Sequence, residues 1–263
     1  MKLFDSHCHI DDKIYNQDFS QMLQRAHAAG VAGMMIAGIT LKTAEKAIQL
    51  AENNGGLFAA VGVHPHDAAS CSETVVQRLR ELSRSDKVKA WGEIGLDFNR
   101  MYSPRHDQEK WFVRQLEEAD SLNLPLIIHE RDSDGRLLTI LAQTHHADRK
   151  GVIHCFSGNR KELEEYLALG YCIGITGILT IQTRGKDLRA MVRHIPTDRL
   201  LIETDAPYLT PAPEKNKIRR NEPAFVRSTF LKLAEILEKP ADELAATLWD
   251  NTCRLFAIQA SEL

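Results

Sequence analysis

Phe4-Asp5-Ser6-His7-Cys8-His9-Ile10-Asp11 stands near the N-terminus of the 263-residue chain, after an apolar start and before a helical pattern. The stretch predicts a β-strand, in which side chains alternate between two faces, so that His7 and His9 point the same way. Two adjacent imidazoles are costly to bury unless something binds them, and one metal ion can accept both. A lone strand histidine is more often a core or rim residue, so metal binding and packing both stay open at this point.

The rest of the chain alternates apolar runs with amphipathic segments, which predicts strands alternating with helices. Further strands are expected at 31–37, 57–63, 88–95, 124–129, 151–156, 171–176 and 200–204. Helices are expected at 17–30, 41–53, 73–84, 105–122, 135–145, 160–169 and 185–194, with two more at 223–237 and 240–256. Eight strands joined by helices predict an α/β protein with a single (β/α)8 TIM-type barrel domain over residues 1–263 and two extra C-terminal helices. A doubly wound parallel sheet is the alternative.

Composition narrows the classes of function. A formal net charge of −3 gives no global basic surface, so contact with nucleic acid has to come from a local patch. Five cysteines without a C-x-x-C pair indicate reduced thiols, which favours the cytoplasm. The chain shows neither a secretion signal nor an apolar run approaching the ~20 residues that span a bilayer, so no membrane association is expected. No obligate protein partner is evident.

Metal-competent side chains end several of the expected strands, and a barrel concentrates its chemistry at those ends. Four histidines and two carboxylates belong to this set, namely His7, His9, His129, His154, Glu93 and Asp205. Each alone has a structural explanation, such as capping a helix or bonding within the rim. Together they would repel one another or be costly to desolvate without cations between them. Six ligands exceed the needs of one tetrahedral ion, and a bridging carboxylate such as Glu93 would suit a binuclear site.

The chain resembles a TatD-family metal-dependent hydrolase, one branch of the amidohydrolase-type barrels, over nearly its whole length. The resemblance rests on Asp5-Ser6-His7-Cys8-His9, Gly62-Val63-His64-Pro65-His66, Gly92-Glu93-Ile94-Gly95-Leu96-Asp97, His129, His154-Cys155-Phe156-Ser157-Gly158 and Glu203-Thr204-Asp205-Ala206-Pro207-Tyr208.

The resemblance implies one divalent ion held by His7, His9, Glu93 and Asp205, and a second held by Glu93, His129 and His154. Glu93 would bridge the ions, and Asp205 would be the general base toward a metal-activated water. Mg or Mn is expected in the active enzyme, with Zn possible in the purified protein. The implied activity is 3′-5′ exonucleolytic cleavage, mainly of single-stranded DNA and possibly of RNA.

Substrate contacts are expected from residues that follow the strands. His64 and His66 share a face at the end of the third strand, and Arg131, Arg219 and Arg220 belong to a larger set of loop cations. Residues 206–222 are expected to form a flexible basic flap that contacts phosphates without reading sequence. The aromatic residues Phe98, Tyr102, Phe156 and Tyr208 could stack bases or simply pack the loops.

Two other hypotheses remain at this stage. The same site could serve an amidase, esterase or lactonase acting on a small metabolite, which a deep closed pocket would favour. A non-catalytic metal-dependent binding protein is the third hypothesis, although the ligand set with Asp205 exceeds what binding needs.

Overall fold

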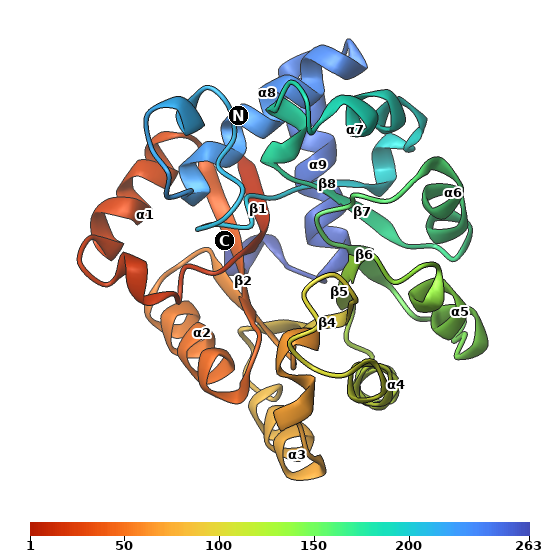
Figure 1. Ribbon diagram of the computed structural model, residues 1–263. Helices are drawn as coiled ribbons and strands as arrows, with labels where there is room; N and C mark the ends of the chain where they lie inside the picture. The colour runs from red at the N-terminus through yellow and green to blue at the C-terminus, as the bar shows by residue number, and fades with distance from the viewer. The chain divides into compact units, whose positions relative to one another are not determined.

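The computed structural model describes residues 1–263 and contains one eight-stranded sheet with the strands in chain order, β1 to β8. The strands are β1 Leu3–Cys8, β2 Val31–Gly38, β3 Leu57–Val61, β4 Val88–Asp97, β5 Leu126–Arg131, β6 Gly151–Ile153, β7 Cys172–Ile175 and β8 Leu200–Ile202. The helices between them are α1 Phe19–Ala28, α2 Leu41–Asn53, α3 Glu73–Leu82, α4 Arg105–Leu122, α5 Arg136–Gln143, α6 Arg160–Ala168 and α7 Lys186–Met191, and α8 Val226–Leu237 and α9 Ala241–Leu255 follow β8 (Figure 1). The predicted (β/α)8 TIM-barrel fold with two additional C-terminal helices is confirmed.

The residues group into two compact units. The first comprises residues 1–36, 54–57 and 173–263, and the second comprises residues 37–53 and 58–172. The single domain over residues 1–263 stays a prediction. No helix has the length and apolar content that a membrane span requires.

In the first unit, the segment after β8 runs beside β1. The backbone N–H of Asp205 donates to the carbonyl of His7 at 3.0 Å, and the N–H of His9 donates to the carbonyl of Ala206 at 2.7 Å. The last strand is therefore a neighbour of the first, which an open doubly wound sheet would not allow. Below these residues, Phe4 packs edge to face on Trp249 of α9, with ring centroids 5.8 Å apart.

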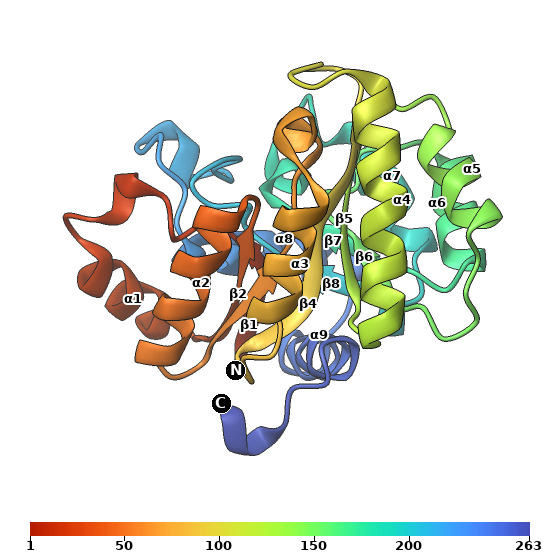
Figure 2. The same cartoon turned by 90° about the horizontal axis from the view of Figure 1, so that it is seen from below.

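In the second unit, β4 and β5 pair in parallel along most of their lengths. Gly95 has a φ of +144°, and a Cβ at this position would overlap the carbonyl oxygen of His129. Only glycine permits this close approach of the two strands, which brings the metal-competent side chains of β4 and β5 together. Helix α4 covers β4 (Figure 2), and its Gln115 side chain accepts from the Val63 N–H at 2.7 Å and from the Trp91 indole at 3.3 Å.

Several strands end earlier than their apolar runs predicted. His9 follows β1, and His154 and Asp205 follow β6 and β8, so these three side chains lie just beyond the ladder and not within it. At β8 the backbone turns into the left-handed region, with a φ of +57° at Asp205. This turn, beyond the end of β8 at Ile202, re-aims the Asp205 side chain, which period-two alternation could not anticipate.

Candidate metal centre

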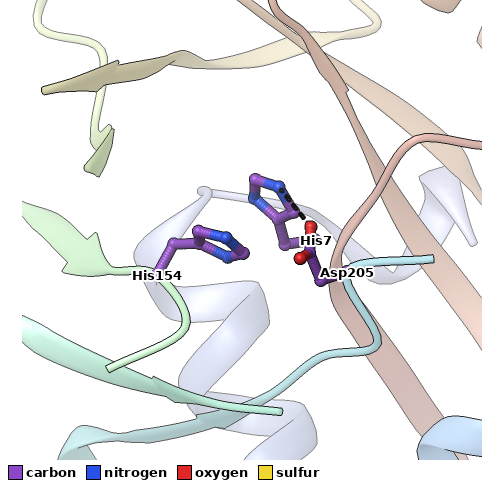
Figure 3. Close-up of side chains that lie close together, drawn as sticks. All are labelled: His7, His154 and Asp205. Carbon is purple, nitrogen blue, oxygen red and sulfur yellow. Dashed lines mark ion pairs between the residues drawn. The ribbon is translucent and has the colours of Figure 1, made fainter. Parts of the chain in front are cut away.

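The first unit brings His7, His9 and Asp205 into one cluster. The Nε2 atoms of His7 and His9 lie 3.1 Å apart, and they lie 3.7 and 3.5 Å from Oδ1 of Asp205 (the His7–Asp205 pair is dashed in Figure 3). Bonds of about 2.0–2.2 Å to a single ion place neighbouring ligand atoms roughly 3–3.5 Å apart. These three donors therefore fit one divalent cation. The structure places the histidine pair beside Asp205, and their role as metal ligands stays a prediction.

The second unit surrounds Glu93 with histidines. Oε1 of Glu93, a side chain that is 3% exposed, lies 2.8 Å from Nδ1 of His129, 3.5 Å from Nε2 of His64 and 3.7 Å from Nε2 of His154. A buried carboxylate that faces three imidazoles strongly favours a positive charge beside it, either a bound cation or a protonated imidazole. The cluster of His64, Glu93 and His129 has the spacing of a metal-binding group.

Asp97 extends this second cluster. Its Oδ2 lies 2.8 Å from Nε2 of His66 and 3.2 Å from Nε2 of His129, so the His129 ring is held between two carboxylates. Burial alone would lower the pKa of His129, but the hydrogen bonds with Asp97 and Glu93 raise it to about 9. Burial alone would raise the pKa of Asp97, and its hydrogen bonds with His129 and His66 hold it well below the ordinary value. A cation bound by His129 would take the place of the ring's second proton.

His64 has a different protonation state. Burial lowers its pKa to about 4, so the imidazole is neutral near pH 7. Its Nδ1 accepts from the backbone N–H of His66 at 3.0 Å, which leaves Nε2 as the protonated nitrogen facing Glu93. In this tautomer the neutral His64 donates from Nε2 toward Glu93. A role toward substrate, as the sequence predicted, stays a prediction.

A buried network holds the residues around Asp205. The carboxylate of Asp5 accepts from the N–H and hydroxyl of Thr204 at 2.8 and 2.6 Å. The side-chain amide of Asn221 donates to the carbonyls of Thr204 and Tyr208 at 2.9 and 2.5 Å. Asp205 is thus fixed from both sides, because the residues that flank its loop are clamped to β1 and to a distant segment of the same unit.

The predicted basic contacts differ in their surroundings. Arg220 makes a bidentate pair with Asp18, with both N–O distances at 2.7 Å, and its guanidinium lies 4.9 Å from the ring of Tyr15. This anchor, together with the Asn221 clamp, ties down the end of the segment that was expected to be a flexible flap. Arg219 is exposed, and Arg131 is the half-buried last residue of β5.

Two residues of the site were not assigned a role from the sequence. Asp97 shares the period-two face of Glu93 on β4, and that spacing was a usable signal. Asn221 lies far along the chain from the residues that it holds, and no local sequence pattern indicates its role.

The comparisons with known proteins agree with this geometry. Residues 4–257 match the family described as TatD related DNase. A protein of Cronobacter sakazakii named 3′-5′ ssDNA/RNA exonuclease TatD is 40% identical over 262 residues, which cover 98% of this chain and 99% of that one. Its namesake from Pectobacterium carotovorum is 38% identical and covers 97% and 100%. The crystal structure of YJJV, a TatD homologue from Escherichia coli K12, superposes with a TM-score of 0.90 at 33% identity and covers 98% of each chain. The chain therefore belongs to the TatD-related DNase family.

Proposed function

We propose that this protein is a divalent-metal-dependent phosphodiesterase that trims single-stranded DNA or RNA from the 3′ end. The names of relatives that are 38% and 40% identical over nearly their whole lengths support the substrate and the polarity. The observation that carries the chemistry is the cluster of His7, His9 and Asp205, whose donor atoms lie 3.1–3.7 Å apart. Donors of these types at these separations suit a divalent cation and a hydrolytic reaction.

The proposed centre holds two ions. One is assigned to His7, His9, Glu93 and Asp205, and the other to Glu93, His129 and His154. The assignment is supported by the fold, since the carboxyl ends of all strands of a (β/α)8 barrel meet at one rim. It is also supported by the chemistry of Glu93, because a carboxylate can bridge two ions about 3.5–4 Å apart. Mg or Mn suits phosphate chemistry, and the histidine-rich set would take up Zn during purification.

The protein's own side chains supply the remaining steps. Bound divalent ions would lower the pKa of water and polarise the phosphodiester. The Asp205 side chain is 15% exposed, so its carboxylate can reach solvent and accept the proton of the attacking water. The neutral Nε2–H of His64 faces Glu93 at 3.5 Å and would donate to a phosphate oxygen, without adding charge, once Glu93 binds the ions. Glu93, 3% exposed, presents its carboxyl group to the surrounding histidines.

The test is a chelator-controlled assay against a panel of substrates. The purified protein is stripped with EDTA, reloaded with Mg, Mn or Zn, and offered a 5′-labelled single strand, the matching duplex, a lactone and an amide. We expect stepwise shortening of the single strand from its 3′ end, lost with EDTA and restored by metal. Turnover of the lactone or amide without nucleic-acid cleavage would favour the small-metabolite alternative, and metal binding without turnover would favour a binding protein.

The two adjacent arginines are expected to respond differently to truncation. Arg219→Ala should weaken single-strand binding uniformly across sequences and reduce the slope of log K against log salt by about one, because one phosphate contact is lost. Arg220→Ala should instead lower the free energy of unfolding, by about 1 kcal/mol, because Asp18 loses its bidentate partner.

Binding measured over a salt series and urea unfolding separate these two effects. Equal salt slopes for Arg219→Ala and the wild type would remove Arg219 from the substrate contacts.

We further propose a cytoplasmic location, which is supported by the observation that none of the five cysteines forms a disulfide.

A further inference from the structure

Exposed apolar side chains are concentrated in a few loops. Eight large hydrophobic residues are exposed, and five of them follow the carboxyl ends of β1, β4 and β8. These five are Ile14, Met101, Tyr102, Tyr208 and Ile218, whereas Met1 and Leu263 are chain ends and Leu231 lies on α8. Of these strands, β1 carries His7 and β4 carries Glu93, and β8 precedes Asp205. Exposed apolar side chains near ligand-bearing strands are candidates for contacts with a substrate.

Tyr208, one of these exposed residues in the first unit, lies beside the metal-competent residue His9. Its side chain is 56% exposed, and its ring lies 6.1 Å from the ring of His9 in an edge orientation. The backbone beneath it is fixed, because its N–H donates to the carbonyl of Asp205 at 2.8 Å and its carbonyl accepts from Asn221 at 2.5 Å. These two hydrogen bonds hold the main chain that carries the ring beside the Asp205 loop.

The other aromatic residues of these loops behave differently. Phe156 is 2% exposed, and Phe98 lies under the guanidinium of Arg105, which is 4.4 Å from the ring centroid. These two rings serve packing. Tyr102, in the second unit, is 67% exposed, and its ring contacts the ring of His66. Tyr208 is thus the exposed ring that is tied by hydrogen bonds to the Asp205 loop.

We propose that Tyr208 is a specificity-determining residue that stacks on the nucleobase of the 3′-terminal nucleotide while its phosphodiester lies at the Asp205 cluster. The inference rests on the proposed nuclease function. Stacking of a base on an aromatic side chain tolerates any sequence, because every base has a π-face. It also requires an unpaired base, so a ring in this place selects single strands over duplex ends. The 6.1 Å between the rings of Tyr208 and His9 lies within the reach of one nucleotide.

The experiment pairs three variants with two substrates. Tyr208→Ala, Tyr208→Phe and the wild type, all loaded with Mn, are assayed on an oligothymidylate and on the same strand with an abasic 3′-terminal nucleotide. We expect Tyr208→Ala to lower kcat/KM on the normal strand on the order of 5- to 150-fold, mainly through KM. On the abasic strand the wild type should fall to the level of the Ala variant, and Tyr208→Phe should match the wild type on both. Leu231→Ala, another exposed apolar residue, is the control and should change neither rate.

The outcomes separate the proposal from the function on which it rests. Equal losses by Tyr208→Ala on the normal and the abasic strand would show that the ring acts through structure, and would overturn the stacking role while leaving the nuclease intact. An undiminished rate for Tyr208→Ala on the normal strand would also overturn it. Absence of cleavage of either strand by the wild type would reject the nuclease function itself, and stacking with it.

Discussion

Asp205→Asn is expected to abolish hydrolysis while the fold is retained. The amide cannot accept the proton of the attacking water, and it replaces an anionic ligand beside His7 and His9, so we expect kcat to fall at least about a hundredfold. The fold should tolerate the change, since asparagine is among the residues that accept the left-handed backbone found at this position, with a φ of +57°. Steady-state turnover on a single-stranded oligonucleotide, with metal content measured on the same sample, is the readout.

Asp120→Asn is the matched control for that variant. Asp120 is 18% exposed against 15% for Asp205, and it pairs with Arg149 at 2.6 Å and belongs to none of the groups that could hold a metal ion. It should lose stability and keep turnover. Near-normal turnover of Asp205→Asn with two ions bound would place the general base elsewhere.

The fold was predictable in large part because strands such as β2 and β3 carry continuous apolar runs. Strands covered on both faces must be apolar throughout, and β2 and β3 are almost wholly buried as their sequences indicate. Helix α4 begins and ends where its pattern does, at Arg105 and Leu122. Strand ends were less predictable, because β6 and β8 end at Ile153 and Ile202 although the predicted runs continue to residues 156 and 204, and hydrophobicity does not indicate where the ladder of hydrogen bonds stops.

The ligand-type residues were visible in the sequence because barrel strands deliver their chemistry at one end. Their pairings were not. The contact of His129 with both Glu93 and Asp97 depends on how β4 and β5 are staggered, and the close approach at Gly95 sets that stagger. The pairing of Arg220 with Asp18 joins residues some two hundred positions apart, so a basic residue that looked available for substrate is held within the protein.

Glu93→Gln is expected to dismantle the two-ion centre. Oε1 of Glu93 faces His129, His64 and His154 within 3.7 Å, and a neutral amide oxygen is a much poorer ligand and a poorer bridge between two cations. Metal content, measured by inductively coupled plasma mass spectrometry after dialysis, should fall from two ions per chain to one or fewer. Turnover should fall at least about a hundredfold, in line with the loss of metal-ion catalysis.

The metal-free protein offers a second readout of the same change. His129 owes its raised pKa of about 9 in part to Glu93, so Glu93→Gln should lower that pKa in an NMR titration, because an anionic partner of the imidazolium is lost. Glu118→Gln is the matched control, since Glu118 is 6% exposed and is paired with Arg80 and Arg114, both on outer helices. That variant should unfold at lower denaturant concentration and still bind two ions. If Glu93→Gln also kept two ions per chain, Glu93 would not bridge them, and each ion would have to be held by the histidines and Asp205 alone.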